Sequence, residues 1–96
     1  MYEIRETEKF SSWLQKLKDI RAKARIMIRI ERLASENPGD VKAIGDGISE
    51  LRIDYGPGYR IYFTKKKKVI IILLVGGNKK TQSADIKKAI ELAQGL

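Results

Sequence analysis

The 96-residue sequence contains no cysteine and no histidine, and these two absences exclude several kinds of chemistry. Disulfide scaffolds, thiol nucleophiles, zinc clusters and histidine general bases all need one of the missing residues. Any catalysis must therefore use lysine, arginine, tyrosine, aspartate, glutamate, serine or threonine side chains.

Long hydrophobic segments are also missing. The longest apolar run, residues 69–75, is far shorter than the roughly 20 residues that a membrane helix needs. The N-terminus is charged from its third residue onward and lacks the apolar stretch of a secretory signal. We expect a cytoplasmic protein with no membrane partner.

What the sequence does contain is enough apolar material for one core and an excess of positive charge. Hydrophobic residues make up 43% of the chain, and its length predicts a single domain over residues 1–96. The net charge is +8; residues 1–47 carry 10 basic and 8 acidic side chains, whereas residues 48–96 carry 10 and 4. This imbalance favours an anionic partner, either nucleic acid or an acidic protein, bound by the second half of the chain.

The first half of the chain predicts a short strand over residues 1–5 and then two helices. Thr7 suits a helix N-cap, and apolar residues recur at three- and four-residue steps from Phe10 to Leu17, in a helix that ends near Asp19. A second helix is expected from about Arg21 until Asn37-Pro38-Gly39. Its expected inward-facing residues are Ala24, Met27, Ile28 and Leu33. Its basic residues, which we expect to form a solvated face, are Arg21, Lys23, Arg25, Arg29 and Arg32.

The second half changes to a two-residue alternation. Strands are predicted over residues 48–55, 59–64 and 69–75, and the last is apolar at every position, as in a central strand. A small helix follows from Ser83 to Gly95. The order β-α-α-β-β-β-α predicts an α+β fold, a small antiparallel sheet packed against an N-terminal helical hairpin.

A cluster of polar side chains is expected on one face of this sheet. If the strands over residues 48–55 and 59–64 pair across Gly56-Pro57-Gly58, then Arg52, Arg60 and Tyr62 point from the same face. The loop that contains Lys79, Lys80 and Gln82 would border that face. Two guanidiniums and two amines suit a phosphodiester. Nucleic-acid binding, an acidic protein partner and an ordinary solvated sheet all remain open at this point.

The run of Lys65, Lys66, Lys67 and Lys68 is the most conspicuous charge feature. Such a run is typical of a solvent-exposed hairpin turn. The functional alternative is long-range attraction of nucleic acid, which would depend strongly on salt.

Three sequence blocks in order carry a resemblance to a known family: Glu-Leu-Arg ending at Arg52, Gly-Pro-Gly-Tyr-Arg ending at Arg60, and Gly-Gly-Asn-Lys-Lys-Thr-Gln ending at Gln82. Together they resemble the RelE/ParE toxin superfamily, in particular its phage-derived Gp49-like or HigB-like branch of addiction module killer proteins. The resemblance covers essentially the whole chain. It implies a type II toxin that cleaves mRNA on the ribosome and is neutralised by a cognate antitoxin, often a helix-turn-helix DNA-binding protein. The alternatives are a ParE-type DNA gyrase poison and a non-catalytic component of a repressor complex.

The resemblance also implies roles for individual residues, with no metal and no cofactor. Arg60 is expected to stabilise the phosphate, with Arg52 as its helper. Lys79 or Lys80 would contact the phosphate or assist proton transfer, while Tyr62 and Gln82 would stack on or contact a base. The expected catalytic residues are Arg52, Arg60, Tyr62 and Lys79, and the expected RNA-binding residues are Lys80, Gln82, Lys65, Lys66, Lys67 and Lys68.

The sequence departs from better-known members of the superfamily at the proton-transfer groups. Ile48 and Glu50 stand in the strand region where RelE has lysines, and histidine is absent. Glu50 is one candidate for the general base, and a lysine or tyrosine whose pKa is lowered by surrounding cations is another. Alternatively, Glu50 pairs with Arg52 or Arg60 and only orders the sheet.

Overall fold

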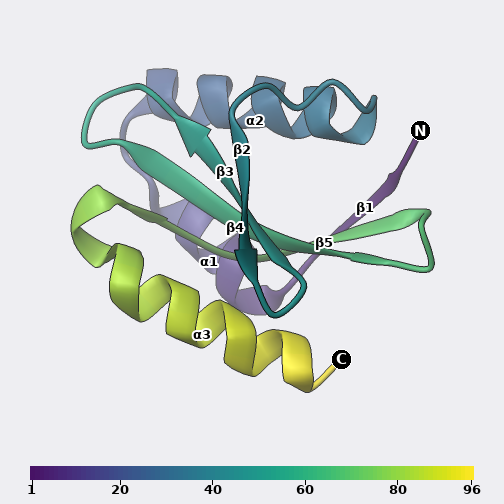
Figure 1. Ribbon diagram of the computed structural model, residues 1–96. Helices are drawn as coiled ribbons and strands as arrows, with labels where there is room; N and C mark the ends of the chain where they lie inside the picture. The colour runs from purple at the N-terminus through teal and green to yellow at the C-terminus, as the bar shows by residue number, and fades with distance from the viewer.

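A five-stranded mixed sheet separates two hydrophobic clusters in the computed structural model, which describes residues 1–96 (Figure 1). The strand order is β1-β5-β4-β3-β2. The strands are β1 (Glu3–Glu6), β2 (Val41–Gly45), β3 (Ile48–Ile53), β4 (Tyr59–Lys66) and β5 (Ile70–Asn78). The α+β class is therefore confirmed, as is the central position of the apolar strand.

The sheet has two features that the sequence did not predict. β2 is an additional strand, antiparallel to β3, and β1 pairs in parallel with β5. The register of β2 shifts between Ala43 and Gly45, so its apolar residues Val41 and Ile44 are three positions apart and the two-residue alternation is lost.

Helices cover both faces of the sheet: α1 (Glu8–Lys16) and α2 (Ile20–Ala34) lie on one face, and α3 (Gln82–Gln94) lies on the other (Figure 1). Thr7 caps α1 as expected, since its Oγ1 accepts a hydrogen bond from the N–H of Phe10 and donates one to the carbonyl of Leu74. Asp19 is not the end of α1 but the N-cap of α2, because its carboxylate accepts hydrogen bonds from the N–H groups of Arg21 and Ala22. None of the helices could cross a lipid bilayer.

The inward face of α2 differs from the predicted one. The buried residues are Ala22, Ile26, Ile30 and Leu33. Met27 and Ile28 are 46% and 56% exposed, so their prediction as core residues was wrong, as was that of Ala24. Apolar residues lie on two overlapping stripes of this helix, and only the packing against the sheet selects between them.

The supposedly polar face of β3 and β4 is not open to solvent over its whole length. Tyr62 is 0% exposed and Glu50 is 1% exposed, because α3 packs over them with Ala89 and the partly buried Ile86. The ends of the strands next to the β3–β4 turn, around Arg52 and Arg60, stay accessible, and so does the opposite end around Lys66. This coverage confines any site on that face to the ends of the sheet.

Candidate functional site

Glu50 is a buried carboxylate at the centre of a polar network between β3, β4 and α3. Its Oε2 accepts hydrogen bonds from the Tyr62 hydroxyl at 3.0 Å and from Nε2 of Gln82 at 2.8 Å. The same oxygen lies 3.5 Å from Nε of Arg60, and Oε1 lies 3.9 Å from Nε of Arg52. The expected alternative in which Glu50 pairs with the arginines is therefore the arrangement in the structure.

The two arginines are direct cross-strand neighbours, Arg52 on β3 and Arg60 on β4. Two guanidiniums in this position would repel each other, and the Glu50 carboxylate compensates because it lies within 3.9 Å of the Nε atoms of both. Their Nε atoms are buried and make no hydrogen bond, whereas Nη2 of Arg52 donates to Asp40 at 3.1 Å and Nη1 of Arg60 donates to the Gly58 carbonyl at 3.0 Å. The Glu50 carboxylate thus stabilises the two arginines on their buried side, while the terminal nitrogens of their guanidiniums lie at the surface.

A cleft of about 350 Å³ lies above this pair, and we call it the arginine cleft. Its walls include Asp40, Arg52, Gly58, Tyr59, Arg60 and Lys79. Lys79 begins the short 3-10 turn Lys79–Thr81 (η1), and its N–H donates to the Pro57 carbonyl, which fixes the turn against the β3–β4 loop. Three cationic side chains from three segments of the chain therefore converge on one concave surface, as the sequence predicted for Arg52, Arg60 and Lys79.

Tyr62 and Gln82 lie beneath the arginine cleft rather than in it. The Tyr62 side chain is fully buried, and the side-chain amide of Gln82 donates its hydrogen bond to Glu50. Neither side chain is therefore positioned to contact a nucleotide base in the cleft. Burial raises the pKa of Tyr62, and its hydrogen bond to Glu50 raises the pKa further. The alternative of a tyrosine base with a lowered pKa is therefore wrong for Tyr62, which is a neutral donor here.

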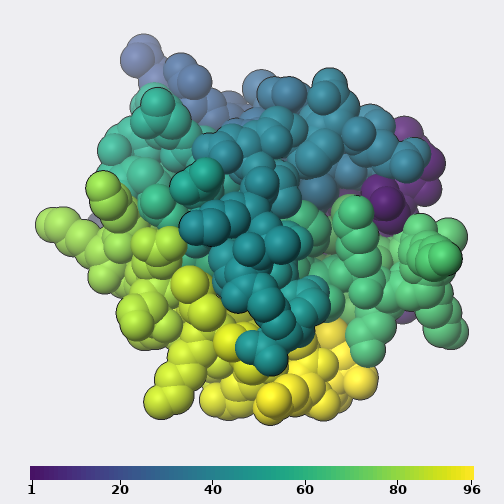
Figure 2. Space-filling view, in the orientation of Figure 1, coloured from purple at the N-terminus to yellow at the C-terminus, as the bar shows by residue number.

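The remaining predicted residues are divided between two places. Lys80 is exposed on η1, where its N–H donates to the side chain of Asn78. Lys65 and Lys66 end β4, while Lys67 and Lys68 form the β4–β5 turn with positive φ angles of 54° and 63°. This hairpin projects from the side of the molecule opposite the η1 turn (Figures 1 and 2). Lys66 lies six positions after Arg60 along an extended strand, about 20 Å away, so the lysine run is not part of the arginine cleft.

Two residues that sequence reasoning missed support the cleft. Asp40 binds Arg52, and Arg29 of α2 donates hydrogen bonds to the carbonyls of Pro38, Asp40 and Arg52. Burial lowers the pKa of Arg29 from its ordinary value, and nearby Arg32 lowers it further. The prediction that Arg29 belongs to a merely solvated face was wrong. No spacing signal identifies it, because its partners are backbone oxygens 9 to 23 positions away.

Comparison with known proteins places this arrangement in a family. The model of the phage-derived Gp49-like family matches residues 12–96. The chain belongs to the Gp49-like family. This membership confirms the resemblance that the three sequence blocks carry.

The Gp49-like chain is similar to a protein of known sequence and to two solved structures. An uncharacterized protein of Haemophilus influenzae is 55% identical over 94 residues, which is 98% of this chain and 95% of the relative. A double mutant of the E. coli toxin RelE, solved in the free state, has a TM-score of 0.75 at 18% identity and covers 94% of this chain and 95% of its own. The intact E. coli RelBE toxin–antitoxin complex gives a TM-score of 0.65 at 13% identity, over 81% of this chain and 96% of the other. The Gp49-like chain therefore has the RelE fold.

Proposed function

We propose that this Gp49-like protein is the toxin of a type II toxin–antitoxin pair and that it inhibits translation by cleaving mRNA on the ribosome. Its partners would be the ribosome, mRNA and a cognate antitoxin, a helix-turn-helix DNA-binding protein, in the cytoplasm. The observation that carries the proposal is the pair of neighbouring guanidiniums, Arg52 and Arg60, beside Lys79 in one cleft. The fold that the chain shares with the E. coli toxin RelE and with the toxin of the E. coli RelBE toxin–antitoxin complex supports it.

The arginine cleft suits a phosphodiester because its cations come from rigid elements. Arg60 is only 13% exposed and is oriented by Gly58 and Glu50, so little reorganisation is needed when negative charge develops on a phosphate. Arg52 is 40% exposed and pairs with Asp40 at the surface. A phosphate that enters the cleft replaces Asp40 as the partner of Arg52, since a guanidinium binds phosphate with two parallel hydrogen bonds.

The reaction we propose is transesterification within the RNA. The ribose 2′-oxygen forms a bond to the adjacent phosphorus, the bond from phosphorus to the 5′-oxygen breaks, and the 2′-hydroxyl proton leaves to water. Arg60 and Arg52 stabilise the extra negative charge on the phosphorane, and the Lys79 ammonium gives a proton to the departing 5′-oxygen. The products are a 2′,3′-cyclic phosphate and a free 5′-hydroxyl.

Glu50 acts as a positioning residue in this scheme and not as the general base. Both of its oxygens face protein donors, and α3 separates the carboxylate from solvent. With the Glu50 side chain only 2% exposed, a ribose hydroxyl does not reach either oxygen. Its charge instead fixes the two guanidiniums in one orientation.

The test is induced expression in bacteria and incubation with translating ribosomes, each followed by mapping of RNA 5′ ends. We expect new 5′ ends inside the codon at the ribosomal A site. Arg60→Ala should reduce cleavage by about 10²- to 10³-fold, the usual cost of removing one fixed donor to a developing anion. Arg21→Ala is the matched control, because this exposed arginine of α2 makes no side-chain hydrogen bond or ion pair.

The other outcomes identify the alternatives. Intact messages with the wild-type protein contradict the proposed cleavage. Inhibition of DNA supercoiling without RNA cleavage indicates a gyrase poison, and unaffected growth on expression indicates a non-catalytic component of a repressor complex.

A further inference from the structure

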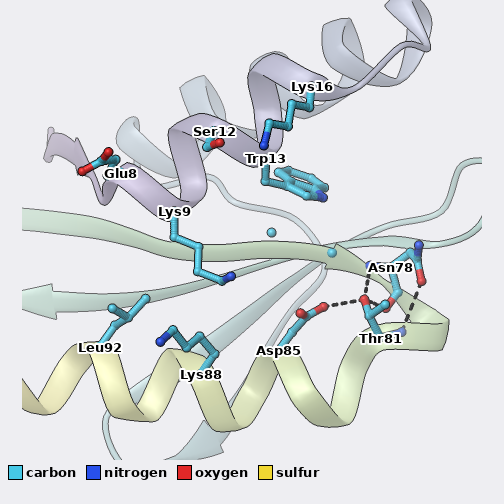
Figure 3. Close-up of a pocket in the computed structure, with 12 residues that line it drawn as sticks. Glu8, Lys9, Ser12, Trp13, Lys16, Asn78, Thr81, Asp85, Lys88 and Leu92 are labelled. Atoms are coloured by element: carbon cyan, nitrogen blue, oxygen red, sulfur yellow. Dashed lines mark hydrogen bonds between the residues drawn. The ribbon is translucent and has the colours of Figure 1, made fainter.

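A second and larger cleft, of about 740 Å³, lies between α1 and α3 (Figure 3). Its floor is the end of β5 at Gly76 and Gly77. β1 pairs with β5 only as far as Leu73, so the last residues of β5 have no neighbouring strand on this side. We call this concave surface the helix cleft, and its volume falls within the range of small-ligand sites.

Two glycines make the helix cleft possible. A Cβ atom on Gly76 would lie 2.2 Å from the Trp13 ring, and one on Gly77 would lie 1.8 Å from the Asp85 carboxylate. Any larger residue would therefore displace a wall of the cleft. The glycine floor lets an indole from α1 and a carboxylate from α3 lie directly against the strand.

The walls combine an aromatic ring with an excess of lysine. Lys9 from α1 and Lys88 from α3 reach into the gap between the two helices (Figure 3), and Lys16 also lines it. Lys9 and Lys16 have no carboxylate partner, whereas Lys88 pairs with Glu91 at 3.0 Å. The carboxylates of the cleft are those of Glu8 and Asp85.

Asp85 is occupied by a hydrogen bond from the Thr81 hydroxyl. Trp13 is partly buried, and its ring packs against Phe10 and Tyr59 with the remainder exposed to the cleft. Lysine ammonium groups without partners beside an exposed part of an indole suit a ligand that is both anionic and aromatic.

The helix cleft and the arginine cleft meet at one turn of the chain. Asn78 lines the first and the adjacent Lys79 lines the second. Asn78 also fixes the turn, because its side chain accepts hydrogen bonds from the N–H groups of Lys80 and Thr81. Neighbouring nucleotides of one strand could therefore occupy the two clefts.

We propose that the helix cleft binds a nucleotide of single-stranded RNA that flanks the phosphodiester held in the arginine cleft, with its base against Trp13 and its phosphate at Lys9 and Lys16. The inference rests on the proposed function, since it extends the RNA path from that site. It assigns a binding role to a surface outside the predicted catalytic residues.

Trp13 makes the test direct, because it is the only tryptophan of the chain and it lines this cleft. The probe is a 2′-O-methyl oligonucleotide of about six nucleotides, which matches common single-strand site sizes and has no 2′-hydroxyl to react. We expect saturable quenching of Trp13 emission. An oligonucleotide that is abasic throughout should bind about 5- to 150-fold more weakly, the fold-change that corresponds to loss of one stacked base.

Two charge-reversal variants separate local contact from overall charge. Lys9→Glu with Lys16→Glu changes the cleft, and Lys18→Glu with Lys87→Glu makes the same charge change at exposed positions outside it. The first pair should lower the slope of log affinity against log salt by about 0.7, the value for one lost phosphate contact on a single strand. The second pair should leave that slope unchanged. Equal effects of the two pairs overturn the proposal.

Failure of this inference is distinguishable from failure of the proposed function. Binding of a labelled oligonucleotide, measured by anisotropy, without any change in Trp13 emission overturns the helix cleft proposal and leaves cleavage at the arginine cleft intact. Saturable quenching by a protein that leaves messages uncleaved supports the helix cleft and contradicts the cleavage. Quenching by a polyglutamate peptide that equals quenching by the RNA would also overturn the proposal, because the cleft would then serve an acidic peptide.

Discussion

Replacing Glu50 by glutamine keeps the shape of this side chain and removes the single negative charge that lies between Arg52 and Arg60. In the wild-type protein the carboxylate is about 2% exposed and accepts hydrogen bonds from Tyr62 and Gln82. A glutamine has one acceptor oxygen and presents an amide N–H₂ group to its other neighbours. A donor would then face a donor at the buried Nε of Arg52, and Arg60 would lose its charged partner.

The expected loss of unfolding free energy is about 3 kcal/mol. Hydrogen bonds to charged groups contribute roughly 1.5 to 3 kcal/mol each, and removal of one partner from a buried ion pair costs roughly 3 to 5 kcal/mol in total. We take the lower end, since a glutamine oxygen at the Oε2 position still accepts both hydrogen bonds and only the charge is lost. For a domain of this size, 3 kcal/mol corresponds to a fall in melting temperature of about 12 to 24 °C.

The assay is urea and thermal unfolding followed by circular dichroism, with Glu31→Gln as the matched control. Glu31 is exposed on α2 and its side chain makes no hydrogen bond or ion pair, so its replacement should change stability by less than about 0.5 kcal/mol. A Glu50→Gln protein that unfolds together with the wild type would refute the reasoning. The carboxylate would then not be what holds the two guanidiniums together.

Three further perturbations test neighbouring parts of the structure. Above pH 10 the free energy of unfolding of the wild type should fall by up to about 1.4 kcal/mol per pH unit through Tyr62. The reason is that the unfolded tyrosine loses its proton near pH 10, while burial raises the pKa of the folded one. Tyr62→Phe should flatten this slope in denaturant titrations at several pH values, and equal slopes for the two proteins contradict the prediction. Arg29→Lys should lower the free energy of unfolding in urea by about 2 kcal/mol, since one ammonium group cannot donate to the three carbonyls that the guanidinium binds. An unchanged urea midpoint would show that these hydrogen bonds do not stabilise the fold. Gly76→Ala should lower the free energy of unfolding by about 1 to 3 kcal/mol, because the added methyl group displaces Trp13. The emission maximum of Trp13 should shift, and an emission spectrum identical to that of the wild type would contradict the close packing.

Local patterns account for most of the secondary structure. The N-cap at Thr7, the alternation through β3 and β4 and the apolar run of β5 all involve residues within a few positions of one another, so their physical causes can be seen in the sequence. β2 and the inward face of α2 were mispredicted for the opposite reason. A bulge breaks the first pattern, and the sheet alone decides which apolar stripe of α2 is buried.

The sequence by itself determined the α+β class, the exclusion of histidine and cysteine chemistry, and the position of Arg52 and Arg60 on one face of the sheet. Only the tertiary structure decided which polar residues reach solvent. α3 buries Glu50 and Tyr62 while it leaves the arginine ends accessible, and the strand length keeps Lys65 and its neighbours far from them. Burial and distance depend on segments that are remote in sequence, and no local spacing encodes them.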